Sequence, residues 1–302
     1  MEEKNYLAVD VGGTTVKAAV VDAHGRFVSQ IRKTPIDPTA DREVLIAFFL
    51  ELLEGQVSAA RSMYGSVDGI GIAFPGPFDY VRGIPKLRGL GKYDSLYGLP
   101  LGDILQTRIG EIPIRFINDA DAYTLGEGRF GVGARYGRVM CVCIGTGLGS
   151  GFLIDGIPVK SGATVPPNGW IYDTPINGEP ADVVVSATGL RRMMRRSPAL
   201  RALPDVKELA DLAHGGHAEA LEIFRSFGER LAAVVVPHAV RFQADALILG
   251  GEVSRSADLF DRQLFAQLRK KAIEPLRSIR FGDNALSAIP LLFKEENENA
   301  VI

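Results

Sequence analysis

The sequence of 302 residues predicts an α/β protein built from two similar domains. The main observation is an internal repeat. Residues 6–32 predict strand, glycine-rich turn, strand, turn and strand, and residues 138–160 repeat that order. A second observation is that segments with helical spacing of apolar residues follow each repeat. Because a repeat constrains the fold more than any single motif, we expect two similar domains that face a cleft.

The first half alternates strands and helices. Strands are expected at 6–10, 16–21 and 27–32, because apolar residues there are bounded by turn residues such as Asp22 and Gly25. A buried strand is stopped by the prolines and glycine at 75–77. Further expected elements are a helix at 41–64, a loop at 81–100, a short helix at 101–110, a strand at 113–119 and a helix from 122.

The second half becomes mostly helical after the repeated hairpin. Residues 161–185 are expected to be a loop, and one strand at 245–251 interrupts the helices. Helices are expected at 186–196, 205–214, 216–241, 256–276 and 284–295.

Composition excludes several classes of protein. Apolar content of 46% and charged content of 23% are typical of a soluble globular protein. The formal net charge of −2 provides no basic field, so we expect neither a nucleic acid nor a membrane as partner. Cys141 and Cys143 alternate along one strand, which disfavours a disulfide between them. With no leader peptide or spanning segment evident, we expect a cytoplasmic protein.

The first glycine-rich turn carries residues suited to phosphate and metal chemistry. Glycines expose backbone N–H groups that bind phosphate oxygens, and threonine hydroxyls add donors. The alternative is a tight hairpin turn without a ligand, although such a turn does not require this composition. The candidate residues are Asp10, Gly12, Gly13, Thr14, Thr15 and Lys17.

The second glycine-rich turn lacks charge and is expected only to hold phosphate, through Gly145, Thr146, Gly147 and Gly149. Its letters match a dinucleotide fingerprint, but a strand and not a helix follows, so we reject that interpretation. A third pair, Gly250 and Gly251, follows a strand and would let a nucleoside lie close to the backbone. The alternative there is a strand-to-helix turn without a ligand.

Six segments together resemble the ROK family of sugar kinases and repressors. They are "DVGGTT", "FPGPFD", "NDADAYTLGE", "IGTGLGSGFLIDG", "SATGL" and "LGGEVS", in that order, and they cover nearly the whole chain. The resemblance implies two ribonuclease-H-like domains of the actin-like, hexokinase-type superfamily flanking a cleft. It also implies ATP-dependent phosphorylation of a hydroxyl on a hexose or hexose derivative.

The resemblance assigns roles to individual residues. The first turn would hold the γ-phosphate, and Asp10 would orient hydrated Mg²⁺. Lys17 would either neutralise phosphate or lie exposed at the strand edge. Asp119 would be the general base and Asn118 would bind a neighbouring sugar hydroxyl. The alternative for "NDAD" is a helix cap, since Asn and Asp favour that position.

One region departs from the family pattern. Many members carry Gly-Glu-x-Gly-His and a cysteine-rich zinc site after the second turn, but residues 161–190 hold no Cys or His. We therefore expect no zinc. Asp182 falls where the family has a second sugar-binding glutamate, and Trp170 is a candidate to stack on the sugar, with a surface role as its alternative. Losing the Glu and His predicts that glucose is a poor substrate.

Two other functions compete with a sugar kinase. A repressor of the same family would carry a DNA-binding domain before the first turn, and here that turn begins at residue 10. A catalytically inactive sugar or nucleotide sensor is the other alternative, and Asp10 together with Asp119 argues against it. We expect a homodimer whose smaller domain comprises 1–117 with about 285–302, and whose larger domain comprises 118–284.

Overall fold

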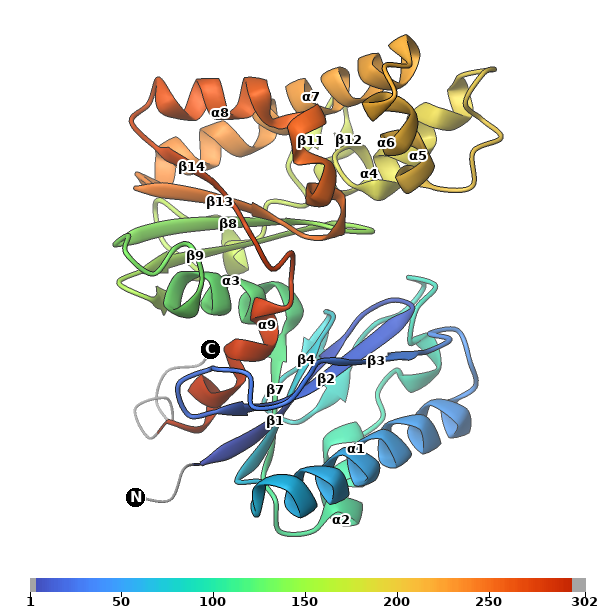
Figure 1. Cartoon of the computed structure of the whole chain (residues 1–302), viewed down its shortest axis with the longest axis vertical. Helices are drawn as coiled ribbons and strands as arrows, with labels where there is room; N and C mark the ends of the chain where they lie inside the picture. The colour runs from blue at the N-terminus through green and yellow to red at the C-terminus, as the bar shows by residue number, and fades with distance from the viewer. Residues whose placement is uncertain (1–3, 295–302) are drawn as a thin grey trace. The chain divides into compact units, whose positions relative to one another are not determined.

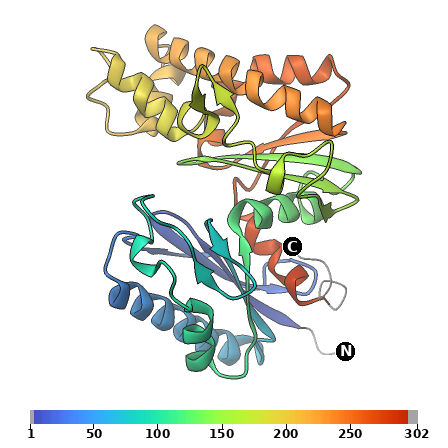
Figure 2. The ribbon, with the colours of Figure 1, turned by 180° about the vertical axis from the view of Figure 1, so that it is seen from behind.

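The computed structural model describes residues 4–294, which fall into two compact units. Unit 1 contains the chain up to Gly126 and the segment from Asp283 onward, whereas unit 2 is the continuous stretch Glu127–Gly282. The chain therefore leaves unit 1 once, builds unit 2, and returns (Figures 1 and 2).

The sheet of unit 1 has the strand order β3-β2-β1-β4-β7. β1 pairs antiparallel with β2, and β2 with β3, whereas β1, β4 and β7 run parallel. The five strands are β1 (Asn5–Val11), β2 (Thr15–Asp22), β3 (Arg32–Pro35), β4 (Gly69–Phe74) and β7 (Ile114–Asn118).

Different segments cover the two faces of this sheet (Figure 1). Alternate strand residues such as Leu7 and Val9 pack with α1 (Arg42–Tyr64) and α2 (Leu101–Ile109) in one apolar core. The opposite face is covered by α9 (Asn284–Ser287) and the 3₁₀ helix η4 (Ile289–Phe293). A Cβ on Gly69 would lie 2.5 Å from the ring of Phe293, so glycine there lets η4 pack against the sheet. Asp10 and Lys17 occupy alternate positions that belong to this second face.

Unit 2 repeats the same topology. Its sheet has the order β10-β9-β8-β13-β14, with β8 and β9 forming the antiparallel hairpin and β8, β13 and β14 running parallel. The strands are β8 (Arg138–Ile144), β9 (Leu148–Ile154), β10 (Ile157–Pro158), β13 (Ala246–Gly250) and β14 (Glu274–Arg277). The predicted internal repeat is confirmed.

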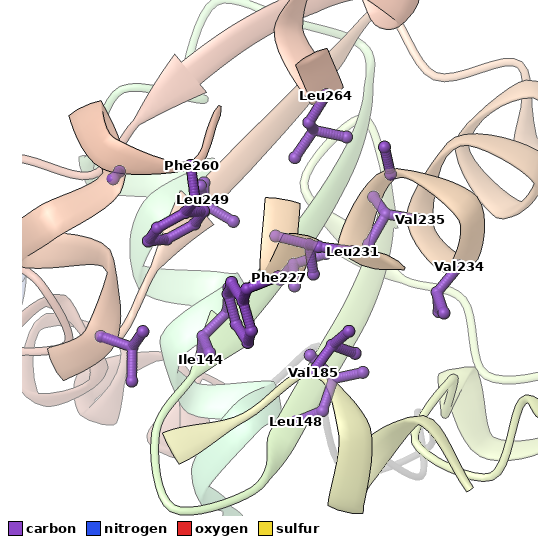
Figure 3. Close-up of a cluster of buried hydrophobic side chains, with 14 of the residues drawn as sticks. Ile144, Leu148, Val185, Phe227, Leu231, Val234, Val235, Leu249, Phe260 and Leu264 are labelled. Carbon is purple, nitrogen blue, oxygen red and sulfur yellow. The ribbon is translucent and has the colours of Figure 1, made fainter. Parts of the chain in front are cut away.

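Helices cover one face of the second sheet. The main ones are α5 (Ala187–Arg196), α6 (Val206–His214), α7 (Ala218–Phe242) and α8 (Asp261–Arg269). Figure 3 shows how side chains of α7 and α8 meet those of the hairpin and β13; its labelled residues are Ile144, Leu148, Val185, Phe227, Leu231, Val234, Val235, Leu249, Phe260 and Leu264. Helix α3 (Asp119–Phe130) begins in unit 1 and ends in unit 2.

Short elements complete the chain. In unit 1 they are β5 (Phe78–Asp79), β6 (Ile84–Pro85) and η1 (Asp94–Leu96). In unit 2 they are η2 (Pro167–Gly169), β11 (Pro175–Ile176), β12 (Glu179–Pro180), α4 (Ala181–Val184) and η3 (Glu252–Leu259).

The third strand of the first repeat was expected at 27–32, and this placement is wrong. Strand β3 is Arg32–Pro35, and Phe27 forms only an isolated bridge with Val21. The hydroxyl of Ser29 accepts a hydrogen bond from the backbone N–H of Val20 at 2.8 Å. A side chain therefore takes the place of a ladder bond, and regular pairing begins after it.

The single helix expected at 256–276 is also wrong, because the 3₁₀ helix η3 runs to Leu259 and α8 spans Asp261–Arg269. α8 ends at Arg269, and Ala272 adopts a left-handed conformation with φ of 58° while its N–H donates to the carbonyl of Arg269. This closes the helix, and the chain then adds β14 to the sheet beside β13.

The helix expected at 284–295 is interrupted, and its last residue lies outside the described part of the chain. Pro290 has no N–H to continue an α-helix, and η4 replaces it. The division between units falls after Gly126 and after Gly282, nine residues later and two residues earlier than the expected boundaries. A Cβ on Gly126 would lie 1.8 Å from the carbonyl oxygen of Asn284, so this part of α3 packs directly on α9 within unit 1.

Two sequence observations have direct structural counterparts. Cys141 and Cys143 both lie on β8 and form no disulfide with each other. Among the residues that the structure describes, no helix has the length and apolar character needed to cross a membrane.

Candidate active site

The first glycine-rich turn joins β1 to β2 and is closed by its own backbone. The N–H of Gly12 donates to the carbonyl of Thr15 at 3.0 Å. A Cβ on Gly12 would lie 2.8 Å from that carbonyl, so the turn requires glycine at this position. A Cβ on Gly13 would meet nothing within 4 Å, and Gly13 and Thr14 are exposed. Space around Gly13 is therefore open to a ligand.

Tyr93 supports this turn from the loop that leads into η1. Its hydroxyl donates to the carbonyl of Gly12 at 2.6 Å, and the tyrosine is fully buried. Burial raises the pKa of Tyr93, as does the nearby carboxylate of Asp10, so the hydroxyl stays a donor. This support could not be predicted from the sequence, because 81 residues separate Tyr93 from Gly12.

Asp10 and Lys17 lie directly opposite each other in the hairpin, so their side chains share one face. The Nζ of Lys17 lies 2.7 Å from Oδ1 of Asp283, and only 16% of the lysine side chain is exposed. Of the two roles considered for Lys17, exposure at the strand edge is wrong. Burial raises the pKa of Asp10 to about 6; the Lys17 ammonium opposes this shift, and the carboxylates of Asp119 and Asp283 add to it.

Asn118 and Asp119 stand where β7 ends and α3 begins. Oδ1 of Asn118 accepts from the N–H groups of Ala120 at 3.0 Å and Asp121 at 3.2 Å, so Asn118 caps the helix. Its amide also donates to the hydroxyl of Tyr80 at 2.9 Å. A role of Asn118 in sugar binding stays a prediction.

The carboxylate of Asp119 accepts a backbone hydrogen bond and interacts electrostatically with the ammonium of Lys92. Oδ1 of Asp119 accepts from the N–H of Ala120 at 2.9 Å, so this residue shares the capping role. Burial raises the pKa of Asp119, and the Lys92 ammonium acts in the opposite direction. Lys92 comes from the same loop as Tyr93 and was not singled out from the sequence. A carboxylate with a raised pKa is a better proton acceptor than an ordinary aspartate.

The second glycine-rich turn, Gly145–Gly147, is supported by Asp182. The N–H of Leu148 donates to Oδ1 of Asp182 at 2.7 Å. A Cβ on Gly147 would lie 2.5 Å from the same oxygen, so glycine lets the carboxylate approach the turn. Asp182 thus binds the backbone of a candidate phosphate turn, and its expected contact with sugar stays a prediction.

The start of α5 also adjoins this turn. The hydroxyl of Thr188 donates to the carbonyl of Thr146 at 2.9 Å, and the N–H of Ala187 donates to the carbonyl of Gly145 at 2.9 Å. Gly149, expected in the turn, instead lies on β9 opposite Cys143.

The glycine pair at the end of β13 has a structural reason of its own. Gly251 has a φ of 87°, and a Cβ there would lie 2.5 Å from the carbonyl oxygen of Ile144. The pair therefore lets the end of β13 approach the end of β8, next to the second turn. Contact of Gly250 and Gly251 with a nucleoside stays a prediction.

Trp170 lies in unit 2 beside Tyr172, with ring centroids 5.7 Å apart. The buried hydroxyl of Ser150 holds the backbone on both sides of Trp170: it donates to the carbonyl of Gly169 at 2.7 Å and accepts from the N–H of Ile171 at 3.1 Å. This fixes a pair of aromatic rings in which Trp170 is half-buried and Tyr172 is exposed, and stacking of Trp170 on a sugar stays a prediction.

Sugar kinases of known name are similar in sequence to this chain over nearly its whole length. The chain is 28% identical to a glucokinase from Thermotoga maritima over 97% of this chain and 94% of the relative. It is 24% identical to an N-acetyl-D-glucosamine kinase from Haemophilus influenzae over 92% of this chain and 95% of that one.

A solved structure confirms the predicted fold class. A ROK family glucokinase from Streptomyces griseus, in complex with glucose and AMPPNP, aligns with a TM-score of 0.76 over 95% of this chain and 98% of that one, at 23% identity. The family model described as "ROK family" matches residues 6–285. The chain therefore belongs to the ROK family.

Proposed function

We propose that this protein transfers the γ-phosphoryl group of ATP to a hydroxyl of a hexose or hexose derivative, with Asp119 as the general base. One observation carries this proposal. Asp119 and Asp10 lie in the same unit, and the Asp119 carboxylate helps to raise the pKa of Asp10, so the candidate base lies within electrostatic range of the carboxylate next to the first phosphate turn. Curated relatives over nearly the whole chain carry sugar kinase names, which supports the same activity.

Asp119 has the properties that this role requires. A sugar hydroxyl must lose its proton as its oxygen attacks the phosphorus, and a positioned carboxylate accepts that proton. The raised pKa of Asp119 strengthens it as a proton acceptor, and the Lys92 ammonium opposes that rise. Little other covalent chemistry is required, because phosphoryl transfer depends mainly on position and charge.

Phosphate binding is proposed for each of the two turns. Gly12, Gly13, Thr14 and Thr15 would hold the γ-phosphate, with the ammonium of Lys17 nearby. Gly145, Thr146 and Gly147 would hold the remaining phosphates, and Gly250 and Gly251 the nucleoside. The open space around Gly13 supports the first of these assignments.

The charges around Asp10 fit a hydrated divalent cation. Three carboxylates and one ammonium act together there, which leaves an excess of negative charge. Within residues 4–294, no group of three or more His, Cys, Asp and Glu side chains is arranged to hold a metal directly. Mg²⁺ usually keeps several waters and takes one or two carboxylates, which suits Asp10 as its holder. When bound, the cation would neutralise phosphate charge.

The proposed sugar contacts make a prediction about which sugar is used. Asn118, Asp182 and Trp170 are the proposed contacts, and the altered segment around Trp170 predicts weak use of glucose. A homodimer, a cytoplasmic location and the absence of zinc stay predictions. Light scattering, cell fractionation and elemental analysis test them in turn.

The test is ADP release over a panel of hexoses, hexosamines, N-acetylhexosamines and sugar-like polyols. Asp119→Asn keeps the shape of the side chain but removes the proton acceptor, so turnover should fall by about 10²–10⁴-fold. ADP affinity, measured by calorimetry, should stay unchanged. Asp103→Asn, on the exposed first turn of α2, is the matched control and should leave both quantities unaltered.

Gly13→Val separates nucleotide binding from proton transfer. Its side chain would enter the open space at the first turn, so affinity for AMPPNP, a non-hydrolysable ATP analogue that carries a γ-phosphate, should fall more than affinity for ADP. Turnover of Asp119→Asn within a few-fold of the parent would leave Asp119 as a helix cap only. Absence of ADP release with every sugar would favour the inactive sensor.

A further inference from the structure

Asp283 is a carboxylate that neither the motifs nor the proposed function accounts for. It is the first residue of the segment that returns to unit 1, and it directly precedes α9. Its Oδ1 lies 2.7 Å from Nζ of Lys17, and only 27% of its side chain is exposed. This ion pair joins positions 266 residues apart in the sequence, so the return of the chain creates it.

Lys17 has two carboxylates within its electrostatic reach. Asp10 lies directly across the hairpin from Lys17 and on the same face of the sheet. Asp283 approaches that face from α9, which contacts β1 and β2. A lysine side chain is a flexible stem with one compact charge, so binding to one carboxylate limits its binding to the other.

We propose that Asp283 is a positioning residue: it holds the Lys17 ammonium at the start of α9 and thereby leaves the Asp10 carboxylate available to a hydrated divalent cation. The inference rests on the proposed function, because that cation accompanies the nucleotide. Without Asp283, the Lys17 ammonium pairs with Asp10, which lies opposite Lys17 in the hairpin. An ammonium bound to Asp10 occupies the oxygens that the water shell of the cation would use.

A simpler role for Asp283 makes a different prediction. If the pair only attaches the C-terminal segment, loss of Asp283 lowers stability without a specific effect on the cation. If Asp283 only adds negative charge, its loss and the loss of Lys17 change cation affinity in opposite directions and by amounts that add. The proposed role predicts that the two effects depend on each other.

The experiment is a double-mutant cycle on Mn²⁺ binding in the presence of ADP, without sugar and without turnover. The electron paramagnetic resonance signal of free Mn²⁺ gives the fraction bound. Asp283→Asn should weaken Mn²⁺ binding about fivefold, which is the scale of one ion pair near a surface. Lys17→Met should change binding little in the parent but restore it in the Asp283→Asn background. Asp79→Asn, which removes another acidic charge from unit 1, should leave binding unchanged.

Folding and nucleotide binding are checked for each variant by a urea midpoint and by calorimetry with ADP. If Asp283→Asn does not fold, Asp283→Ser takes its place in the cycle, because serine also suits the residue before a helix. Effects of Lys17→Met and Asp283→Asn that simply add, in a parent that releases ADP with a sugar, would overturn the inference alone. A parent that binds no Mn²⁺ and releases no ADP would overturn the proposed function as well.

Discussion

Replacing Asp10 by asparagine should stabilise the protein in the absence of metal and nucleotide, although it should remove activity. Burial and two neighbouring carboxylates hold the pKa of Asp10 at about 6, against 3.8 for the unperturbed group. This is a shift of roughly two pK units, and each unit corresponds to about 1.4 kcal/mol. Because the side chain is only partly buried, we expect the variant to gain about 1–3 kcal/mol at pH 7.5.

The dependence on pH follows from the sign of the shift. An acid whose pKa is raised by folding destabilises the folded state once it is ionised, so the cost is fully present above pH 6. The cost decreases as the pH falls from about 6 to 3.8, where both states become protonated. The gain from Asp10→Asn should therefore be largest at pH 7.5 and smaller at pH 5.

Urea unfolding of both proteins at the two pH values, without Mg²⁺, measures this difference. A destabilised variant at pH 7.5 would refute the reasoning. So would a gain of equal size at both pH values, because it would have a cause other than the charge of Asp10.

Three further predictions concern other parts of the site. Activity should be lost on acidification through the raised pKa of Asp119, and Lys92→Met should move that limb of the kcat/KM profile to higher pH because Lys92 lowers this pKa. Asp182→Ala leaves the backbone N–H of Leu148, directly after the second turn, without its acceptor, so calorimetry should record weaker ADP binding and urea unfolding a loss of about 1–3 kcal/mol. Gly251→Ala combines a positive φ with a backbone clash, whereas Gly89→Ala has the positive φ and open space. The Gly251 variant should therefore lower the urea midpoint more than its control, and equal effects would contradict the close approach.

The sequence predicted those parts of the fold that depend on neighbours along the chain. Both glycine-rich turns were found because each lies between two strands of one hairpin. Asp119 was singled out by the resemblance and by its place after a buried strand, and the structure puts it at the start of α3. Such signals are short in range and survive without any tertiary contact.

Contacts between distant segments could not be predicted in the same way. In the sequence, Tyr93 is a tyrosine in a loop and Asp283 is an acid in a polar stretch. Their roles come from tertiary contacts, of Tyr93 with Gly12 and of Asp283 with Lys17. Strand β14 was not predicted for a similar reason. Glu274–Arg277 becomes a strand by pairing with β13 and has no alternating pattern of its own. Pairing decided its conformation and local preference did not.

The return of the chain to unit 1 has a consequence for biosynthesis. Unit 2 is continuous from Glu127 to Gly282, so a ribosome delivers all of it before residues 283–293 emerge. The sheet face that holds Gly69 and Gly71 is covered by Ile289 and Phe293 and must wait for them. At about 5–20 residues per second, the wait after Gly126 lasts on the order of 10–30 s. The first domain to be translated is thus the last to complete its core, and a nascent chain that stalls before Asp283 would display that uncovered face to chaperones and proteases.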